Sequence, residues 1–242
     1  MPNNKEDTPP TKTMVTEHKG EVLYNWETDI ILEVLNTGTR LTDSSMGAKD
    51  TETSTEITPN KINEEKILKI FESIPKENFL DMSLGKNCYL DKNLDITEKR
   101  GYLKNLHLAQ IIKYSEISHN DKVLHIGGLT GYFSVLISSL CKELLVLEEN
   151  KELFKLLEQN IKNIDTTNIN IFNRNLLDGL NDSAPFNIII IDGPIFKISD
   201  NLKKQLVTNG GRLIYIKKIY DNLGKAYKII RNEDLYSSEY LF

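Results

Sequence analysis

The sequence contains only two cysteines, Cys88 and Cys141, and they form neither a CxxC pair nor a spacing shared with histidines. This pattern excludes a disulfide framework and offers no zinc motif, so we expect two reduced core thiols and no metal site. Long hydrophobic runs are also missing, because stretches such as 188–191 are far shorter than the ~20 residues that cross a bilayer. The first residues, MPNNKEDTPPTKT, lack the apolar segment of a secretory signal. We therefore expect a soluble, cytoplasmic protein that does not contact a membrane.

Positive charge is not in excess either. The chain carries 30 Lys and Arg residues against 35 Asp and Glu residues, which gives a formal charge of -5. Binding along a phosphate backbone needs a basic surplus, so this composition disfavours nucleic acid as a partner. With 242 residues, 39% of them hydrophobic, the chain is long enough for one large α/β domain and an appendage.

The composition divides the chain at about residue 58. Residues 1–58 are rich in Thr, Ser, Asp, Lys and Pro, and we expect a polar, partly disordered arm that is mobile at 37–57. Within this arm, EVLYNWETDIILEVLN at 21–36 has apolar residues near a helical period and predicts one short amphipathic helix, with Trp26 as its packing anchor. Residues 59–242 are expected to form the main domain.

Regular patterns begin at residue 63. Helices are predicted at 63–74, ending before Pro75, and at 102–117, and from residue 122 onward short apolar strands alternate with helices. This alternation predicts an α/β fold with a doubly wound, mostly parallel sheet of the Rossmann-like type. Two further strands with no helix between them predict an antiparallel hairpin at the C-terminal edge. The strands are expected at 122–127, 143–148, 169–173, 187–192, 211–218, 225–232 and 237–242, and the later helices at 131–141, 150–164 and 197–210.

The loops after the strands are the expected ligand site, because doubly wound sheets bind ligands at the carboxyl ends of their strands. The first loop, HIGGLTGY at 125–132, is a glycine-rich turn between a strand and a helix. Glu148 ends the next strand about twenty residues later, where an acid can accept both hydroxyls of a ribose. A dinucleotide motif is not met, because Leu129 and Tyr132 stand where two of its glycines belong. The pattern instead suits a nucleoside-type cofactor such as S-adenosylmethionine.

Several motifs resemble the protein-L-isoaspartate O-methyltransferase family, a class I S-adenosylmethionine-dependent family, and particularly its shorter bacterial branch. The resemblance is carried by DKVLHIGGLTGYFSVLISSL, LLVLEEN, APFNIIIIDGPI, QLVTNGGRLIYI and, upstream, by PKENF at 75–79. It extends over about residues 57–242. It implies a class I methyltransferase fold and transfer of a methyl group from S-adenosylmethionine to the carboxyl group of an isoaspartyl residue in a protein or peptide. A monomer is expected.

The resemblance also implies a set of cofactor-binding positions. The glycine-rich turn would surround the methionine part, Glu148 would bind the ribose, and Asn175 falls where the family usually has an acid beside the adenine. Asp192, at the end of the fourth strand, is placed to contact cofactor or substrate. The full set of expected cofactor-binding residues is Gly127, Gly128, Leu129, Thr130, Gly131, Glu148, Asn175 and Asp192.

The chain departs from the family pattern at the acceptor position. Leu103 stands where the better-known branch has a hydroxyl that helps to hold the substrate carboxylate, so no catalytic residue is assigned. Thr97 and Tyr102 carry nearby hydroxyls, which either substitute for it or serve as ordinary loop and helix-cap groups. Departures within the cofactor motifs are His125, which replaces an acid, Leu129, which replaces a glycine, and Asn175, which replaces an aspartate.

Two alternatives therefore stay open beside isoaspartyl methylation. One is a catalytically degenerate family member that acts as a binding protein, and the other is a methyltransferase with a different acceptor. The two histidines nearest the expected site, His107 and His125, lie in apolar contexts with no carboxylate at a fixed spacing, so structural roles are expected for both.

Overall fold

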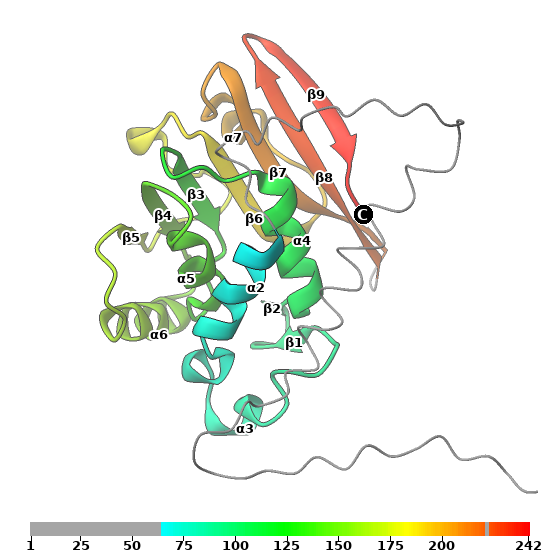
Figure 1. Ribbon diagram of the computed structural model, residues 1–242. Coiled ribbons are helices and arrows are strands. Elements are labelled where there is room, and N and C mark those ends of the chain that lie inside the picture. Colours follow the sequence, from blue (N-terminus) through cyan, green and yellow to red (C-terminus); the bar gives the residue numbers. More distant parts are fainter. Residues whose placement is uncertain (1–63, 221–222) are drawn as a thin grey trace, which may run out of the picture.

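The computed structural model of the chain describes residues 64–220 and 223–242 (Figure 1). The amino-terminal arm predicted at 1–58 and its helix at 21–36 lie outside the described residues, so both stay predictions. The described residues fall within the range 59–242 expected for the main domain, and the boundary at residue 58 stays a prediction.

A seven-stranded sheet forms the centre of the described part, in the order β5-β4-β3-β6-β7-β8-β9. The first five of these strands run parallel, and β8 and β9 are antiparallel additions at one edge. Both the doubly wound α/β class and the C-terminal hairpin are thus confirmed. The strands are β3 (Lys122–Ile126), β4 (Glu143–Leu147), β5 (Ile169–Phe172), β6 (Ile188–Ile195), β7 (Asn209–Tyr220), β8 (Leu223–Asn232) and β9 (Leu235–Tyr240).

Alternate side chains of the central strands enter two different cores. In β6, Ile188 and Ile190 belong to one cluster of buried residues, and Ile189 and Ile191 belong to the other. A run of four isoleucines forms a strand here because both faces of the sheet are covered, so neither set of side chains faces water.

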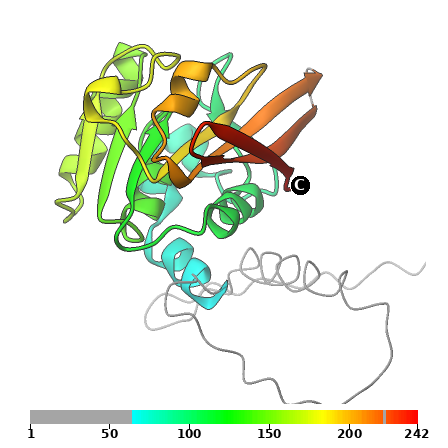
Figure 2. The ribbon, with the colours of Figure 1, turned by 90° about the horizontal axis from the view of Figure 1, so that it is seen from above.

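Four helices pack on one face of the sheet and a short helix packs on the other (Figures 1 and 2). The four are α2 (Glu64–Ser73), α4 (Asn105–Ser115), α5 (Tyr132–Ser138) and α6 (Lys151–Lys162), and the short one is α7 (Asp200–Lys204). Asn150 caps α6 by accepting hydrogen bonds from the amides of Glu152 and Leu153, as expected of an Asn at this position.

The prediction of a helix over 197–210 was too long. After α7 the chain pairs with the segment that precedes β6. Leu206 forms a parallel bridge with Phe186, and the Val207 amide donates to the Phe186 carbonyl at 2.8 Å. These contacts compete with helical hydrogen bonds, and β7 already begins at Asn209. Tertiary pairing therefore overrides the local helical pattern.

Several short elements lie between α2 and α4. They are the 3-10 helix η1 (Lys76–Phe79), the short helix α3 (Met82–Gly85), and a two-stranded hairpin of β1 (Leu94–Asp95) and β2 (Gly101–Tyr102). Another 3-10 helix, η2 (Asn181–Ser183), lies between β5 and β6. In the hairpin, Tyr102 of β2 stands where we had expected the second helix to begin, and α4 starts only at Asn105. Its second strand packs against β6.

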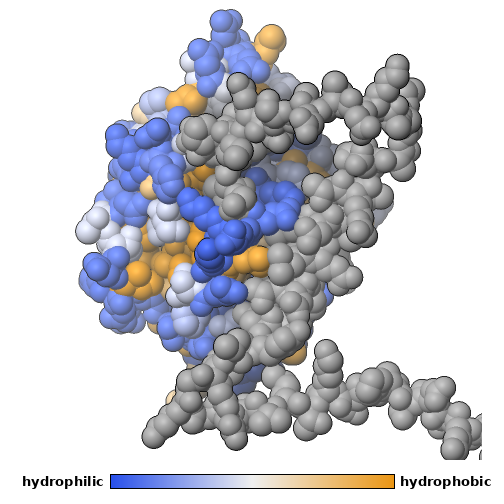
Figure 3. Space-filling model, in the orientation of Figure 1, coloured by the Kyte–Doolittle hydropathy of each residue, from blue (hydrophilic) through white to orange (hydrophobic). Residues whose placement is uncertain are grey.

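On the face seen in Figure 3, the surface of the described part is mostly hydrophilic, with smaller hydrophobic areas near its middle. Among the described residues, no helix is both long enough and apolar enough to span a membrane.

Candidate functional site

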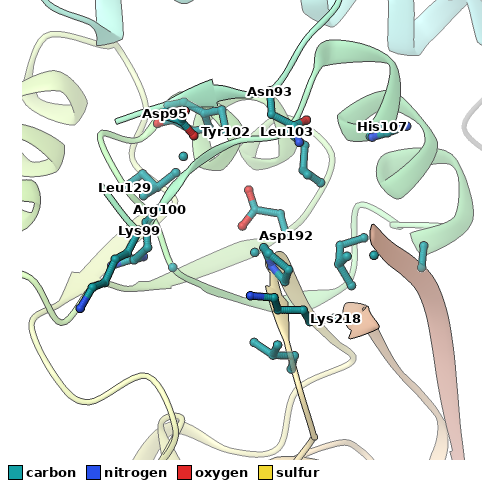
Figure 4. Close-up of a pocket in the computed structure, with 18 of the residues that line it drawn as sticks. Asn93, Asp95, Lys99, Arg100, Tyr102, Leu103, His107, Leu129, Asp192 and Lys218 are labelled. Atoms are coloured by element: carbon teal, nitrogen blue, oxygen red, sulfur yellow. The ribbon is translucent and has the colours of Figure 1, made fainter. Parts of the chain in front are cut away.

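A cavity of about 820 Å³ lies at the carboxyl ends of the central strands, beneath the β1–β2 hairpin. The strand order reverses there, since β3 pairs with β4 on one side and with β6 on the other. This is the switch point at which doubly wound sheets bind ligands, and the volume lies within the ~300–1,000 Å³ usual for small-molecule sites. The residues that line the cavity include Arg100, Tyr102, Leu103, Leu129, Asp192 and Lys218 (Figure 4).

The glycine-rich turn connects β3 to α5 at the edge of this cavity. Gly127 and Gly131 have positive φ angles of 97° and 102°, which glycine adopts without strain. Leu129 also has a positive φ, of 50°, and its amide is fixed by a 2.9 Å hydrogen bond to Glu148 Oε2. The Leu129 side chain is buried in the core and also lines the cavity.

Glu148 is completely buried, and its carboxylate is paired with Arg100. Arg100 Nη1 donates to Oε1 at 2.6 Å, and Nη2 donates to Oε2 at 2.8 Å. The amides of Leu129 and Asn150 donate to the same two oxygens, each at 2.9 Å. Burial lowers the pKa of the Arg100 guanidinium, but its pairing with Glu148 outweighs this effect and the net shift is upward. The acid at the tip of the second strand is thus held by four donors from this chain.

Arg100 is positioned by the hairpin turn between β1 and β2. Its amide donates to Thr97 Oγ1 at 3.0 Å, and its carbonyl accepts from the amides of Ile96 and Thr97 at 3.0 and 2.8 Å. Thr97 therefore stabilises the hairpin turn, which is the ordinary loop role that we gave as one of its two alternatives. It does not line the cavity. Nη2 of Arg100 lies 3.3 Å from where a Cβ on Gly127 would be, so glycine leaves room for the guanidinium.

The Tyr102 hydroxyl supports the glycine-rich turn from below. It accepts hydrogen bonds from the amides of Thr130 and Tyr132, both at 3.1 Å, and shares a third with Thr130 Oγ1 at 2.9 Å. Burial raises the pKa of this phenol above its usual range. The hydroxyl is committed to the turn, although the ring lines the cavity.

A buried lysine, Lys76, lies close to the rings of Tyr102 and Tyr132. Lys76 is 1% exposed; its Nζ donates to Asn105 Oδ1 at 2.8 Å and lies 5.8 Å and 5.3 Å from the ring centroids of Tyr102 and Tyr132. A buried ammonium over aromatic faces is stabilised electrostatically. Lys76 belongs to the PKENF segment, and its position gives that motif a structural role beneath the turn.

Asp192 projects into the cavity from a bulge in β6. The pairing of β6 with β7 shifts between Ile191 and Pro194, which turns the Asp192 carboxylate toward the open space (Figure 4). Oδ1 lies 3.3 Å from His125 Nε2, and His125 Nδ1 lies 2.8 Å from Ser134 Oγ. Oδ2 is buried and has no hydrogen-bond partner among the described residues. His125 therefore has a carboxylate neighbour that no spacing in the sequence indicated, and it orients Asp192 without lining the cavity.

The remaining predicted residues are divided between the cavity and its surroundings. Leu103 and His107 line the cavity. Burial lowers the pKa of His107, whose ring lies 5.6 Å from that of Phe242. Asn175 is exposed outside the cavity, and its Oδ1 accepts from the Leu177 amide at 2.8 Å. Gly128, Thr130 and Gly131 are buried within the turn and do not line the cavity. That these residues bind a cofactor stays a prediction.

The sequence did not indicate which residues contact Glu148 and Asp192. Arg100 is 48 residues from Glu148, and His125 is 67 residues from Asp192, so neither pair has a local signature. The described residues contain no group of three or more His, Cys, Asp or Glu side chains arranged to hold a metal ion.

Comparison with known proteins matches residues 51–235 to the family model of protein-L-isoaspartate(D-aspartate) O-methyltransferase (PCMT). The protein-L-isoaspartate O-methyltransferase of Koribacter versatilis is 28% identical over 160 residues, covering 66% of this chain and 72% of that protein. The protein-L-isoaspartate O-methyltransferase of Shewanella woodyi is 28% identical over 178 residues, covering 74% of this chain and 83% of that protein.

Two solved structures support the fold. One described as a protein-L-isoaspartate O-methyltransferase has a TM-score of 0.63 at 20% identity, and the match covers 72% of this chain and 57% of that one. Another, described as a PCMT from Plasmodium falciparum in complex with S-adenosyl-L-homocysteine, has a TM-score of 0.63 at 14% identity and covers 89% of this chain and 94% of that one. The chain belongs to the protein-L-isoaspartate(D-aspartate) O-methyltransferase family.

Proposed function

We propose that this chain is an S-adenosylmethionine-dependent carboxyl methyltransferase that acts on isoaspartyl residues of proteins or peptides. The observation that carries the proposal is the buried Glu148 carboxylate behind a glycine-rich turn, at the edge of an 820 Å³ cavity, in a member of this family. We place the protein in the cytoplasm as a monomer, and size-exclusion chromatography tests the second point.

The described residues fit the cofactor, with one rearrangement. Glu148 would take the ribose hydroxyls once Arg100 has left it, because its oxygens now hold four donors. The turn at Gly127 would approach the methionine part, and the unpaired Asp192 Oδ2 would accept from a hydrogen-bond donor of the bound ligand. The cofactor supplies an electrophilic methyl group on a sulfonium.

The acceptor chemistry asks little of the protein. A carboxylate is already ionised and nucleophilic at neutral pH, so no general base is needed, and catalysis consists of holding one oxygen in line with the methyl group in a dry cavity. Leu103 lines the cavity and excludes water but donates no hydrogen bond. Tyr102 contributes its ring, since its hydroxyl is committed to the turn.

Calorimetric titration with S-adenosylhomocysteine, followed by methyl transfer from radiolabelled S-adenosylmethionine, tests the proposal. The acceptor is an isoaspartyl peptide, and the control is the same peptide with a normal aspartyl bond. Binding together with labelling of the isoaspartyl peptide alone supports the function. Absence of binding refutes it and leaves the degenerate binding protein.

A second candidate is methylation of a different acceptor. It is favoured by the buried Asp192 carboxylate, whose charge faces the cavity and repels a second carboxylate, whereas an amine would be attracted. Binding of S-adenosylhomocysteine without labelling of the isoaspartyl peptide, but with labelling of an amine-bearing acceptor, supports this alternative.

A further inference from the structure

The Glu148 carboxylate has no acceptor site left for a ribose. Two carboxylate oxygens offer about four lone-pair positions, and the two N–H groups of Arg100 and the amides of Leu129 and Asn150 occupy all of them. Glu148 is fully buried, so a ribose can reach its oxygens only by replacing one of these partners.

Of the four donors, only those of Arg100 can leave. The Leu129 amide belongs to the turn, and the Asn150 amide belongs to the residue that caps α6, so both are fixed by the backbone. Arg100 reaches Glu148 with a long side chain that is 27% exposed and borders the cavity. Its backbone is held by the hairpin, so the side chain alone would move.

A displaced guanidinium would remain in the cavity, whose lining also includes the two cations Lys99 and Lys218. At the position where the family has a hydroxyl, Leu103 lines the cavity without a hydrogen-bonding group, and Asp192 adds a buried carboxylate with one oxygen that has no partner among the described residues. Arg100 and Asp192 both line the cavity, and Figure 4 shows the Asp192 carboxylate with Arg100 on one side and Leu103 on another. A guanidinium there offsets the charge of Asp192 and presents a planar fork of donors to a second carboxylate.

We propose that Arg100 is the acceptor-binding residue of this enzyme. Its guanidinium is paired with Glu148 until the cofactor's ribose displaces it, and it then pairs with the substrate carboxylate. This inference rests on the proposed function. The cofactor must bind first, because only its ribose releases the guanidinium. Arg100 thereby supplies the contact that Leu103 cannot make.

The test compares wild type with Arg100→Gln, Arg100→Lys and the matched control Lys92→Gln. Lys92 is exposed in the same segment, lies outside the cavity, and its replacement removes the same charge. The measurements are the Kd of S-adenosylhomocysteine by calorimetry, and kcat and KM for an isoaspartyl peptide. Thermal melting of each variant, with and without S-adenosylhomocysteine, reports folding.

Arg100→Gln removes the guanidinium that competes with the ribose for Glu148. It should tighten S-adenosylhomocysteine binding at least about tenfold, because hydrogen bonds to a charged group contribute free energy on that scale. The KM for the peptide should rise by about tenfold or more, while kcat changes much less. Arg100→Lys keeps the charge but loses the fork, so both effects should be intermediate, and this variant serves if Arg100→Gln does not fold. Lys92→Gln should match wild type.

Equal or weaker S-adenosylhomocysteine binding by Arg100→Gln than by a binding-competent wild type overturns the displacement. Tighter binding with an unchanged peptide KM overturns the acceptor role. If neither wild type nor any variant binds S-adenosylhomocysteine, the proposed function itself fails and the inference falls with it, an outcome distinct from the first two.

Discussion

Replacing Tyr102 with phenylalanine should destabilise the protein by removing the acceptor beneath the glycine-rich turn. The hydroxyl accepts from the buried amides of Thr130 and Tyr132 at 3.1 Å, and the ring itself is 1% exposed, so water cannot take its place. Each amide left without a partner costs about 1–3 kcal/mol. For Tyr102→Phe, with two such amides, we therefore expect a loss of about 2–6 kcal/mol in the free energy of unfolding. In a domain of this size that corresponds to a fall in Tm of roughly 4–24 °C.

Urea denaturation and thermal melting followed by circular dichroism measure the loss. The matched control is Tyr114→Phe, which deletes the same atom from a partly buried ring stacked on Phe242, where the hydroxyl has no hydrogen bond to a described residue. The control should stay within about 0.5 kcal/mol of wild type. If Tyr102→Phe melts no lower than Tyr114→Phe, the two amides do not depend on this hydroxyl, and the account of the turn is wrong.

Other predictions concern packing, thiol reactivity and pH. Gly128→Ala places a Cβ 2.5 Å from Val146 Cγ1 and should cost about 1–3 kcal/mol in urea denaturation, whereas Gly193→Ala, with nothing within 4 Å, should cost far less. Burial raises the pKa of Cys141 to about 12, so iodoacetamide at pH 8 should label it only after unfolding, and rapid labelling of the folded protein would contradict its burial. Burial lowers the pKa of His107 below 6.5, so its neutral form stabilises the fold above that pH, and this contribution is lost as the pH falls through the lowered pKa. The stability advantage of wild type over His107→Gln should therefore shrink from pH 7.5 to 5, and a constant difference would exclude this titration.

The local pattern of the sequence was enough to predict the order and type of the main elements. Strands such as 188–191 are nearly all apolar because both of their faces are buried, and helices such as α6 carry their own capping residue. The glycine-rich turn and the acid at the tip of the next strand are also local signals, since each follows directly from its place after a strand. Strand and helix order, fold class and the region of the site were therefore readable from the sequence.

The partners within the site were decided only by the tertiary structure. Arg100 meets Glu148, Tyr102 meets the Thr130 amide, and His125 meets Asp192 across 48, 28 and 67 residues of sequence. No periodicity or spacing connects such pairs, because their proximity results from the hairpin folding over the sheet and from a bulge in β6. The sequence identified Glu148 as an acid placed for a ribose, but only the folded chain brings a guanidinium to it, because hydrogen bonds between distant residues depend on where the backbone carries them.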